Sequence, residues 1–224
     1  MKNIDILYED ADCVVLNKPA GLAVQGGDRI TTSLDDLLAE AWHQRPFLVH
    51  RLDKDTSGII LVAKTKEAAR YYSAIICGKR AEKKYLALCN GIISPGKGYI
   101  DEPLEVRGTE KASLTLYNRL VHSEHFSLVE LQLGSGRMHQ IRRHLALIGN
   151  PILGDDKYGD FTLNKVLKKE RSVKRLMLHA WKLTFPSMSL QKNCTVKAPL
   201  PDYFNSFLEI EYGSQILSSP WLSV

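Results

Sequence analysis

The chain of 224 residues has few cysteines, no long apolar run and no glycine-rich phosphate loop. Its four cysteines lie far apart without a Cys-x-x-Cys pair, and its seven histidines are scattered, so neither a disulfide framework nor a metal site is indicated. No apolar stretch approaches the roughly 18 residues that a membrane-spanning helix requires. No glycine-rich loop follows a predicted strand, which argues against nucleotide-cofactor folds. We therefore expect neither a metal, a cofactor nor a membrane span.

The composition is that of an ordinary globular protein. Apolar residues make up 44% of the chain and charged residues 25%, which is enough to build a hydrophobic core. The N-terminal residues have no signal-peptide layout, so we expect a cytoplasmic protein. The length fits one large domain or two small ones.

The net charge of +5 is small, but the basic residues gather in three clusters. A single basic run is usually a solvated face, whereas three together favour a surface that follows the phosphates of a nucleic acid. Only Glu170 opposes the first of these clusters. The clusters consist of Lys165, Lys168, Lys169, Arg171, Lys174 and Arg175; of Lys79, Arg80, Lys83 and Lys84; and of Arg137, Arg142 and Arg143.

The periodicity of apolar residues predicts both strands and helices. Strands are expected over residues 4–8, 13–16, 59–63, 84–90, 113–117, 127–133, 176–185 and 195–197. Helices are expected over residues 33–43, 65–77, 138–148 and 202–210, with Ser33 and Thr65 as N-caps. Because strands and helices mix without a strict β-α-β rhythm, we predict an α+β domain around a mixed, largely antiparallel sheet.

Nine residues from His50 to Gly58 place many polar and ionisable groups between two apolar runs, residues 46–49 and 59–63. Two interpretations fit this composition equally well. The segment is either a polar surface turn that ends at Gly58, or a functional site built between two buried segments.

The order of these residues decides between the two interpretations. His50-Arg51-Leu52-Asp53 followed by Lys54-Asp55-Thr56-Ser57-Gly58 closely resembles the active-site signature of RluA-type pseudouridine synthases. Five further blocks follow the order of that family: residues 17–22, Lys84-Tyr85, residues 136–142, residues 151–155 with Tyr158-Gly159, and Leu178-His179-Ala180. The resemblance covers residues 7–199, and we expect a single catalytic domain over residues 1–224 with a C-terminal helix and tail from residue 200.

This resemblance implies a largely antiparallel sheet flanked by helices, with a central active-site cleft and without metal or cofactor. It implies an enzyme that isomerises uridine in ribosomal or transfer RNA. In that reaction the bond from ribose C1′ to uracil N1 breaks, the base turns, and C1′ rejoins at C5. Asp53 would be the catalytic carboxylate, as a nucleophile or a base, with the Arg137 guanidinium keeping it ionised.

The resemblance also assigns roles to the remaining residues. Tyr85 would stack on the target base and could move a proton, and Arg51 would fill the space that the flipped base leaves. Ile141 would contact the other face of the base. Further RNA contacts are expected from Lys18, His139, Gln140 and Arg142. From the residues alone, Tyr85 and Ile141 also fit an ordinary core, whereas His50, Thr56 and Ser57 fit a loop-holding role.

Two departures from the family pattern and one alternative function accompany this interpretation. Met138 stands where the family usually has a small hydroxyl residue, and we expect no small N-terminal RNA-binding domain. The alternative is a non-catalytic RNA-binding or RNA-folding protein on the same scaffold. A protein that only binds RNA has no need of Asp53, Tyr85 and Arg137 together, so we favour the enzyme, acting as a monomer.

Overall fold

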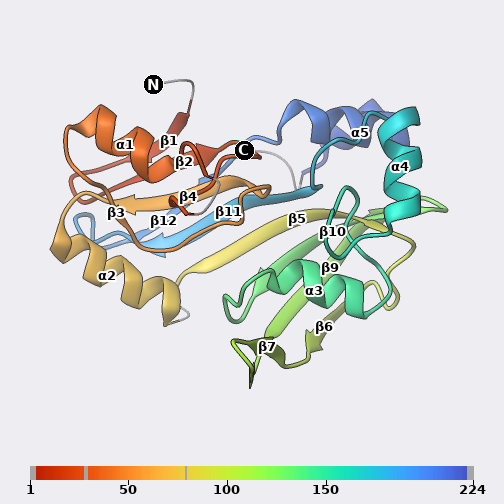
Figure 1. Cartoon of the computed structure of the whole chain (residues 1–224), viewed down its shortest axis with the longest axis horizontal. Coiled ribbons are helices and arrows are strands. Elements are labelled where there is room, and N and C mark those ends of the chain that lie inside the picture. Colours follow the sequence, from red (N-terminus) through yellow and green to blue (C-terminus); the bar gives the residue numbers. More distant parts are fainter. Residues whose placement is uncertain (1–3, 28–29, 79, 221–224) are drawn as a thin grey trace. The chain divides into compact units, whose positions relative to one another are not determined.

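The structure is a computed structural model that describes residues 4–27, 30–78 and 80–220 (Figure 1). The chain divides into two compact units. Unit 1 consists of Met1–Lys83 and Ala180–Ala198, and unit 2 of Lys84–His179 and Pro199–Val224. Each unit thus joins segments that are far apart in the sequence. The expectation of a single domain over residues 1–224 stays a prediction.

Unit 1 is a β-sheet with two helices. Its strands lie in the order β1, β2, β4, β11 and β12, with β3 beside β4, and β11 belongs to this unit from Ala180 onward. The strands are β1 (Asp5–Glu9), β2 (Cys13–Lys18), β3 (Phe47–Leu48), β4 (Ser57–Ala63), β11 (Leu178–Pro186) and β12 (Asn193–Lys197). The helices are α1 (Leu34–Trp42) and α2 (Lys66–Cys77).

The core of unit 1 lies between this sheet and α2. Every residue of β4 is buried, because the strand has sheet neighbours on both sides. Ile59 and Leu61 of β4 pack in one cluster with Tyr72 and Ile75 of α2 and with Phe185 of β11. The rings of Tyr72 and Phe185 meet edge to face, with their centroids 5.8 Å apart.

Both helices of unit 1 begin at the residues that the sequence predicts. The Thr65 side chain accepts the N–H of Ala68 and so caps α2. At α1, Ser33 and Asp36 form a capping box, in which each side chain accepts the backbone N–H of the other residue.

In its described residues, unit 2 is an antiparallel sheet with three α-helices. Its strands lie in the order β5, β10, β9 and β6, and β5 belongs to this unit from Lys84 onward. They are β5 (Glu82–Asn90), β6 (Lys97–Asp101), β9 (Leu114–His122) and β10 (Phe126–Leu133), beside a hairpin of β7 (Leu104–Val106) and β8 (Thr109–Lys111). The helices are α3 (Gln140–Leu147), α4 (Phe161–Glu170) and α5 (Asp202–Tyr212), followed by the short 3₁₀ helix η1 (Ser214–Ser218).

The predicted α+β class with largely antiparallel pairing is confirmed, with several local differences. The sequence did not predict α4 or the strands β3, β6, β7 and β8. Only Leu167 of α4 is buried, which leaves too weak an apolar stripe for a prediction. The helix expected from residue 138 begins at Gln140, because His139 before it has the left-handed φ of 54°.

Within residues 4–27, 30–78 and 80–220, none of the helices combines the length and apolar character needed to cross a bilayer.

Gly58 offers a direct test of the packing in unit 1. Its φ is 105°, and a Cβ atom at this position would collide with the carbonyl oxygen of Ala180. We expect Gly58→Ala to lower the free energy of unfolding by at least about 1–3 kcal/mol, measured by urea denaturation, because backbone strain and a clash act together. Gly108→Ala is the matched control, since Gly108 has a φ of 74° but no atom near its added Cβ. Equal losses in both variants would contradict the proposed clash.

Candidate active site

The first part of the site is the loop that leads into β4 in unit 1. Asp53 lies half-buried between Leu52, which is 5% exposed, and Thr56, which is 2% exposed. The N–H of Thr56 donates to the carbonyl oxygen of Asp53 at 3.2 Å and closes a turn. Arg51 is exposed. Two buried neighbours therefore anchor the turn that carries the Asp53 carboxylate.

The side chain of Lys18 ties this turn to the end of β2. It is fully buried, and its ammonium donates to the carbonyl oxygens of Pro19, Leu22 and Lys54 at 3.0, 2.8 and 3.0 Å. An ammonium has three N–H donors, so all of them are used. The N–H of Gly21 also donates to Lys54 at 2.9 Å. Lys18 therefore holds the Asp53 turn, and this arrangement leaves it no donor for RNA.

Two opposite effects act on the charge of the buried Lys18 ammonium. Burial lowers the pKa of the Lys18 ammonium to about 8, while the negative charges of Asp55 and Asp53 act in the opposite direction. The two carboxylates thus lie close enough to stabilise the cation.

His50 anchors the start of the same loop. Its Nε2 accepts the backbone N–H of Leu61 in β4 at 2.9 Å. Burial, together with the positive charge of Lys83, lowers the pKa of His50 to about 3, so the ring is neutral at physiological pH. This agrees with the prediction that His50 holds the loop through a bond to the backbone.

The second part of the site is the turn before α3 in unit 2, which Gln140 organises. The amide of Gln140, which is 2% exposed, makes four hydrogen bonds. Its oxygen accepts from the hydroxyl of Ser135 at 2.7 Å and from the N–H of Arg137 at 3.0 Å. Its nitrogen donates to Leu114 at 2.9 Å and to Thr115 at 3.1 Å. Gln140 therefore fixes the turn, while Arg137 stays exposed.

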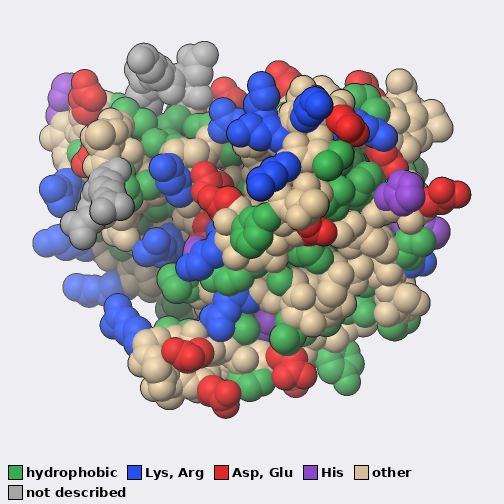
Figure 2. Space-filling model, turned by 45° about the vertical axis from the view of Figure 1, so that its right-hand side comes forward, with side chains coloured by type: hydrophobic (Ala, Val, Ile, Leu, Met, Phe, Trp, Pro, Cys, Tyr) green, Lys and Arg blue, Asp and Glu red, His purple; other side chains and the backbone are tan. Residues whose placement is uncertain are grey.

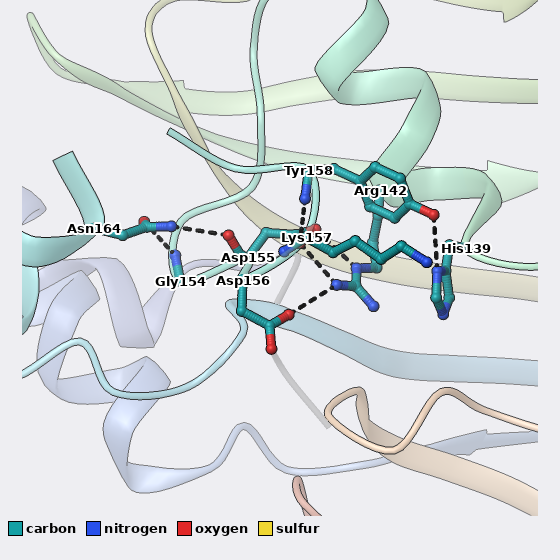
Figure 3. A network of polar contacts seen from close by, with 8 residues as sticks. All are labelled: His139, Arg142, Gly154, Asp155, Asp156, Lys157, Tyr158 and Asn164. Carbon is teal, nitrogen blue, oxygen red and sulfur yellow. Dashed lines mark hydrogen bonds and ion pairs between the residues drawn. The ribbon is translucent and has the colours of Figure 1, made fainter. Parts of the chain in front are cut away.

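Figure 3 shows a second polar network, centred on the buried pair of Arg142 and Asp155. The guanidinium donates to both carboxylate oxygens of Asp155, at 2.8 and 2.7 Å, and to the exposed Asp156 at 3.3 Å. Arg142 is 4% and Asp155 1% exposed. Burial raises the pKa of Asp155, but hydrogen bonds from Arg142, Tyr158 and Lys157 outweigh it and keep the pKa below its usual value.

The network extends from α3 to α4. The ring of His139 lies 3.1 Å from the hydroxyl of Tyr158, measured from Nδ1, and the Arg142 guanidinium lies over the ring of Tyr158 (Figure 3). On the other side, the amide of Asn164 in α4 donates to the carbonyl of Asp155 and accepts the N–H of Gly154, both at 2.9 Å. The segment of residues 154–158 is thus bonded to both helices.

Two apolar candidates lie almost entirely inside unit 2. Tyr85 of β5 is 8% exposed and pairs with Leu131 of β10, and Ile141 of α3 is 4% exposed. Met138, which departs from the family pattern and precedes Ile141 by three positions, is 60% exposed.

The sequence matches a known protein family. A family model described as RNA pseudouridylate synthase matches residues 12–147, more than half of the chain. The chain belongs to the RNA pseudouridylate synthase family. The match includes Lys18, Asp53, Tyr85 and Arg137, and it ends before Asp155. As a member of this family the protein is a pseudouridine synthase, an isomerase that acts on RNA, and the suspected resemblance is confirmed.

Individual relatives of the synthase match over nearly its whole length. It is 36% identical to the tRNA pseudouridine synthase C of Haemophilus ducreyi, over 91% of this chain and 96% of that protein. It is 33% identical to the ribosomal large subunit pseudouridine synthase C of Buchnera aphidicola, over 91% of this chain and 69% of that protein.

Solved structures show the same fold. Human RNA Pseudouridylate Synthase Domain Containing 4 superposes with a TM-score of 0.77 and 30% identity, over 91% of each chain. Human RNA Pseudouridylate Synthase Domain Containing 1 superposes with a TM-score of 0.73 and 29% identity, over 89% of this chain and 84% of that one.

Burial separates the candidate residues of the synthase into two groups. Arg51 and Arg137 are exposed, and Asp53 and His139 are half-buried. Lys18, Tyr85, Gln140, Ile141 and Arg142 are buried. The polar groups of Lys18, Gln140 and Arg142 are bonded within the protein, which gives these residues a positioning role, and the RNA contacts expected from them stay a prediction. Asp53 belongs to unit 1 and Tyr85 and Arg137 to unit 2, so their joint action stays a prediction.

Sequence reasoning assigned no role to three residues that organise the site. Asp155 and Tyr158 belong to a block of the resemblance, but their partners Arg142 and His139 were assigned to RNA. Asn164 belongs to α4, which was not predicted at all. An aspartate and an arginine that both lie in motif blocks were an available signal of a structural ion pair.

The pKa of Lys18 predicts how stability depends on pH. Between about 8, the pKa of folded Lys18, and the ordinary value of 10.5, the unfolded chain binds more protons than the folded one. The free energy of unfolding contributed by Lys18 therefore rises with pH in this window, by up to roughly 3 kcal/mol. We expect the free energy of unfolding of the wild type minus that of Lys18→Met, measured by urea denaturation, to rise from pH 8 to 10. A constant difference would contradict the lowered pKa.

The Arg142–Asp155 pair predicts a large loss of stability on removal of one partner. Arg142→Met leaves a buried carboxylate uncompensated, and we expect it to lower the free energy of unfolding by about 3–5 kcal/mol. The double variant Arg142→Met/Asp155→Leu removes both charges and should lose less. Glu9→Gln serves as the control, because it removes only the exposed carboxylate of the pair between Glu9 and Lys64 and should cost no more than about 1 kcal/mol. Similar losses for the buried and the exposed pair would refute this assignment.

Proposed function

We propose that this synthase isomerises specific uridines in transfer RNA or in the RNA of the large ribosomal subunit, with Asp53 as its catalytic carboxylate. The names of its relatives support these two substrate classes. The single observation that carries the role of Asp53 is its half-buried position in a turn that the buried Lys18 ammonium holds.

In the proposed reaction, the glycosidic bond between C1′ and N1 breaks and a bond between C1′ and C5 forms. C5 loses its hydrogen as a proton, and N1 gains a proton, so atoms and charge balance. Asp53 can serve this reaction by attack on C1′, by addition to C6 of the uracil, or by removal of the C2′ proton. Each route uses the carboxylate of Asp53, and the Lys18 ammonium is near enough to interact with that carboxylate electrostatically.

The other motif residues support the same nucleotide in this proposal. The exposed guanidinium of Arg51 fills the stack after the base leaves it, because a planar cation can stack and donate hydrogen bonds at once. Arg137 is the charge partner of Asp53. Tyr85 stacks on the flipped base and Ile141 contacts its other face. His139 contributes a further contact to RNA.

The proposed substrates fit a cytoplasmic enzyme, and we propose that it acts as a monomer without metal or cofactor.

Substitution of Asp53 tests this proposal in cells. In a strain that lacks the gene, we expect the wild type to restore pseudouridine at defined positions of transfer or ribosomal RNA. Asp53→Asn should restore none and should lower the rate in vitro at least about a thousandfold, because it removes the reacting group. The measurement is pseudouridine mapping across both RNA classes, which also names the substrate.

Asp55→Asn is the matched control, since Asp55 is a half-buried carboxylate of the same loop. It should keep activity within about tenfold. Full activity of Asp53→Asn would refute the catalytic role, and loss of activity only in Asp55→Asn would move that role to Asp55.

A further inference from the structure

Six basic side chains between Lys165 and Arg175 take no part in the reaction described above. They lie on α4 and on the turn after it, in unit 2 (Figure 1). Lys165, Lys168 and Lys169 occupy positions i, i+3 and i+4, which share one side of a helix. All six are exposed, while Leu167 between them is buried. We call α4 with residues 171–175 the α4 ridge.

Two of the six cations are engaged within the protein, and four are not. Arg171 forms an ion pair with Glu211 at 3.2 Å, and the Arg175 guanidinium lies 6.0 Å from the ring centroid of Tyr203. Over residues 4–27, 30–78 and 80–220, the ammonium groups of Lys165, Lys168, Lys169 and Lys174 make no ion pair or hydrogen bond with a side chain. These four neighbouring ammonium groups therefore face solvent without an ion-pair partner among the described residues, and Glu170 is the one carboxylate within the ridge itself.

The other two basic clusters of the sequence are largely used inside the fold. Lys83 donates to a backbone carbonyl, and burial lowers its pKa. Lys84 pairs with a carboxylate at 2.9 Å. Arg142 is buried in its pair with Asp155, and Arg143 donates to a backbone carbonyl. Lys79 lies outside the described residues. Of the three clusters, the α4 ridge thus retains the most unpaired charge in the described part of the chain.

The ridge has a fixed backbone. The carbonyl of Leu167 accepts from the N–H groups of both Arg171 and Val173, at 2.9 and 3.2 Å. Ser172 between them has the left-handed φ of 56°, and Val173 is 4% exposed. Lys174 therefore follows a buried anchor, at a defined place beside the helix. Figure 2, which brings the right-hand side of Figure 1 forward, shows Lys and Arg side chains close together in the upper part of this face.

We propose that the α4 ridge binds the sugar–phosphate backbone of the substrate RNA. Ammonium groups attract phosphates as point charges and carry no sequence information, so the ridge would add affinity without choosing the uridine. This rests on the proposed function, because it takes RNA as the substrate. An acidic protein is the competing partner, and RNA is favoured because an RNA-modifying enzyme must hold a polyanion.

The test replaces the four unpaired lysines. Lys165→Gln/Lys168→Gln/Lys169→Gln/Lys174→Gln is compared with a control of equal charge change, Lys66→Gln/Lys97→Gln/Lys111→Gln/Lys192→Gln, whose lysines are exposed and scattered. Binding of unfractionated transfer and ribosomal RNA from cells lacking the gene is measured over a series of salt concentrations. Pseudouridine formation on the same RNA gives kcat and KM.

We expect the ridge variant to bind RNA at least about tenfold more weakly and to show a raised KM with unchanged kcat. The slope of log affinity against log salt should fall by about 3, since each lost phosphate contact removes about 0.7–0.9. The control should change neither. Replacement of the same four lysines by arginine, which keeps the charge, should retain the affinity. The single variants Lys169→Gln and Lys174→Gln should each lower the slope by about 0.8 and provide a test if the fourfold variant does not fold.

Several results would overturn the proposal. One is a ridge variant whose affinity and salt slope equal those of the control. Another is a loss of kcat at constant KM. Competition by polyglutamate as strong as that by RNA would favour an acidic protein partner. Because binding is measured without turnover, a wild type that binds RNA through the ridge but forms no pseudouridine would count against the proposed function alone.

Discussion

The buried ammonium of Lys18 is the interaction on which the Asp53 part of the site depends. A lysine side chain with no exposed surface is costly unless all its donors are satisfied, and here three carbonyl oxygens satisfy them. One of those carbonyls belongs to Lys54, the residue after Asp53. The position of the proposed catalytic carboxylate is therefore set by hydrogen bonds to the backbone around it. Any movement of the loop would break a buried bond to a charged group, which opposes such movement.

In unit 2, buried polar side chains also fix the backbone by hydrogen bonds. Gln140 uses its whole amide to fix the turn that carries Arg137, and Arg142 uses its guanidinium to hold Asp155. The residues of the motif blocks thus divide their tasks by burial. The buried polar ones build the frame. Arg51 and Arg137 are exposed and Asp53 is half-buried, and these are the residues for which we propose contact with RNA.

The sequence predicts what local signals determine. Ser33 and Thr65 mark the starts of α1 and α2 because capping needs only residues three positions away. The α+β class follows from short apolar periods. Which polar side chain is buried depends on partners far along the chain, such as Leu114 for Gln140 and Asp155 for Arg142. The bonds of Gln140 could therefore not be predicted from its motif, and the one signal for Arg142 was that it and Asp155 both lie in motif blocks. The helix α4 was not predicted, because a single buried residue, Leu167, does not produce a periodic pattern of apolar residues.

The bonds of Asn164 have a mechanical consequence for unit 2. From α4, its amide holds the backbone of residues 154 and 155; Asp155 holds Arg142 of α3; and Gln140, at the first turn of α3, holds the N–H of Arg137. The α4 ridge and Arg137 are therefore connected, through α3, by a continuous series of buried and half-buried hydrogen bonds. An RNA bound to the α4 ridge would have its phosphates held at a constant distance from Arg137. In that case the distance from the bound phosphates to Arg137 would be the same whatever the base sequence of the RNA.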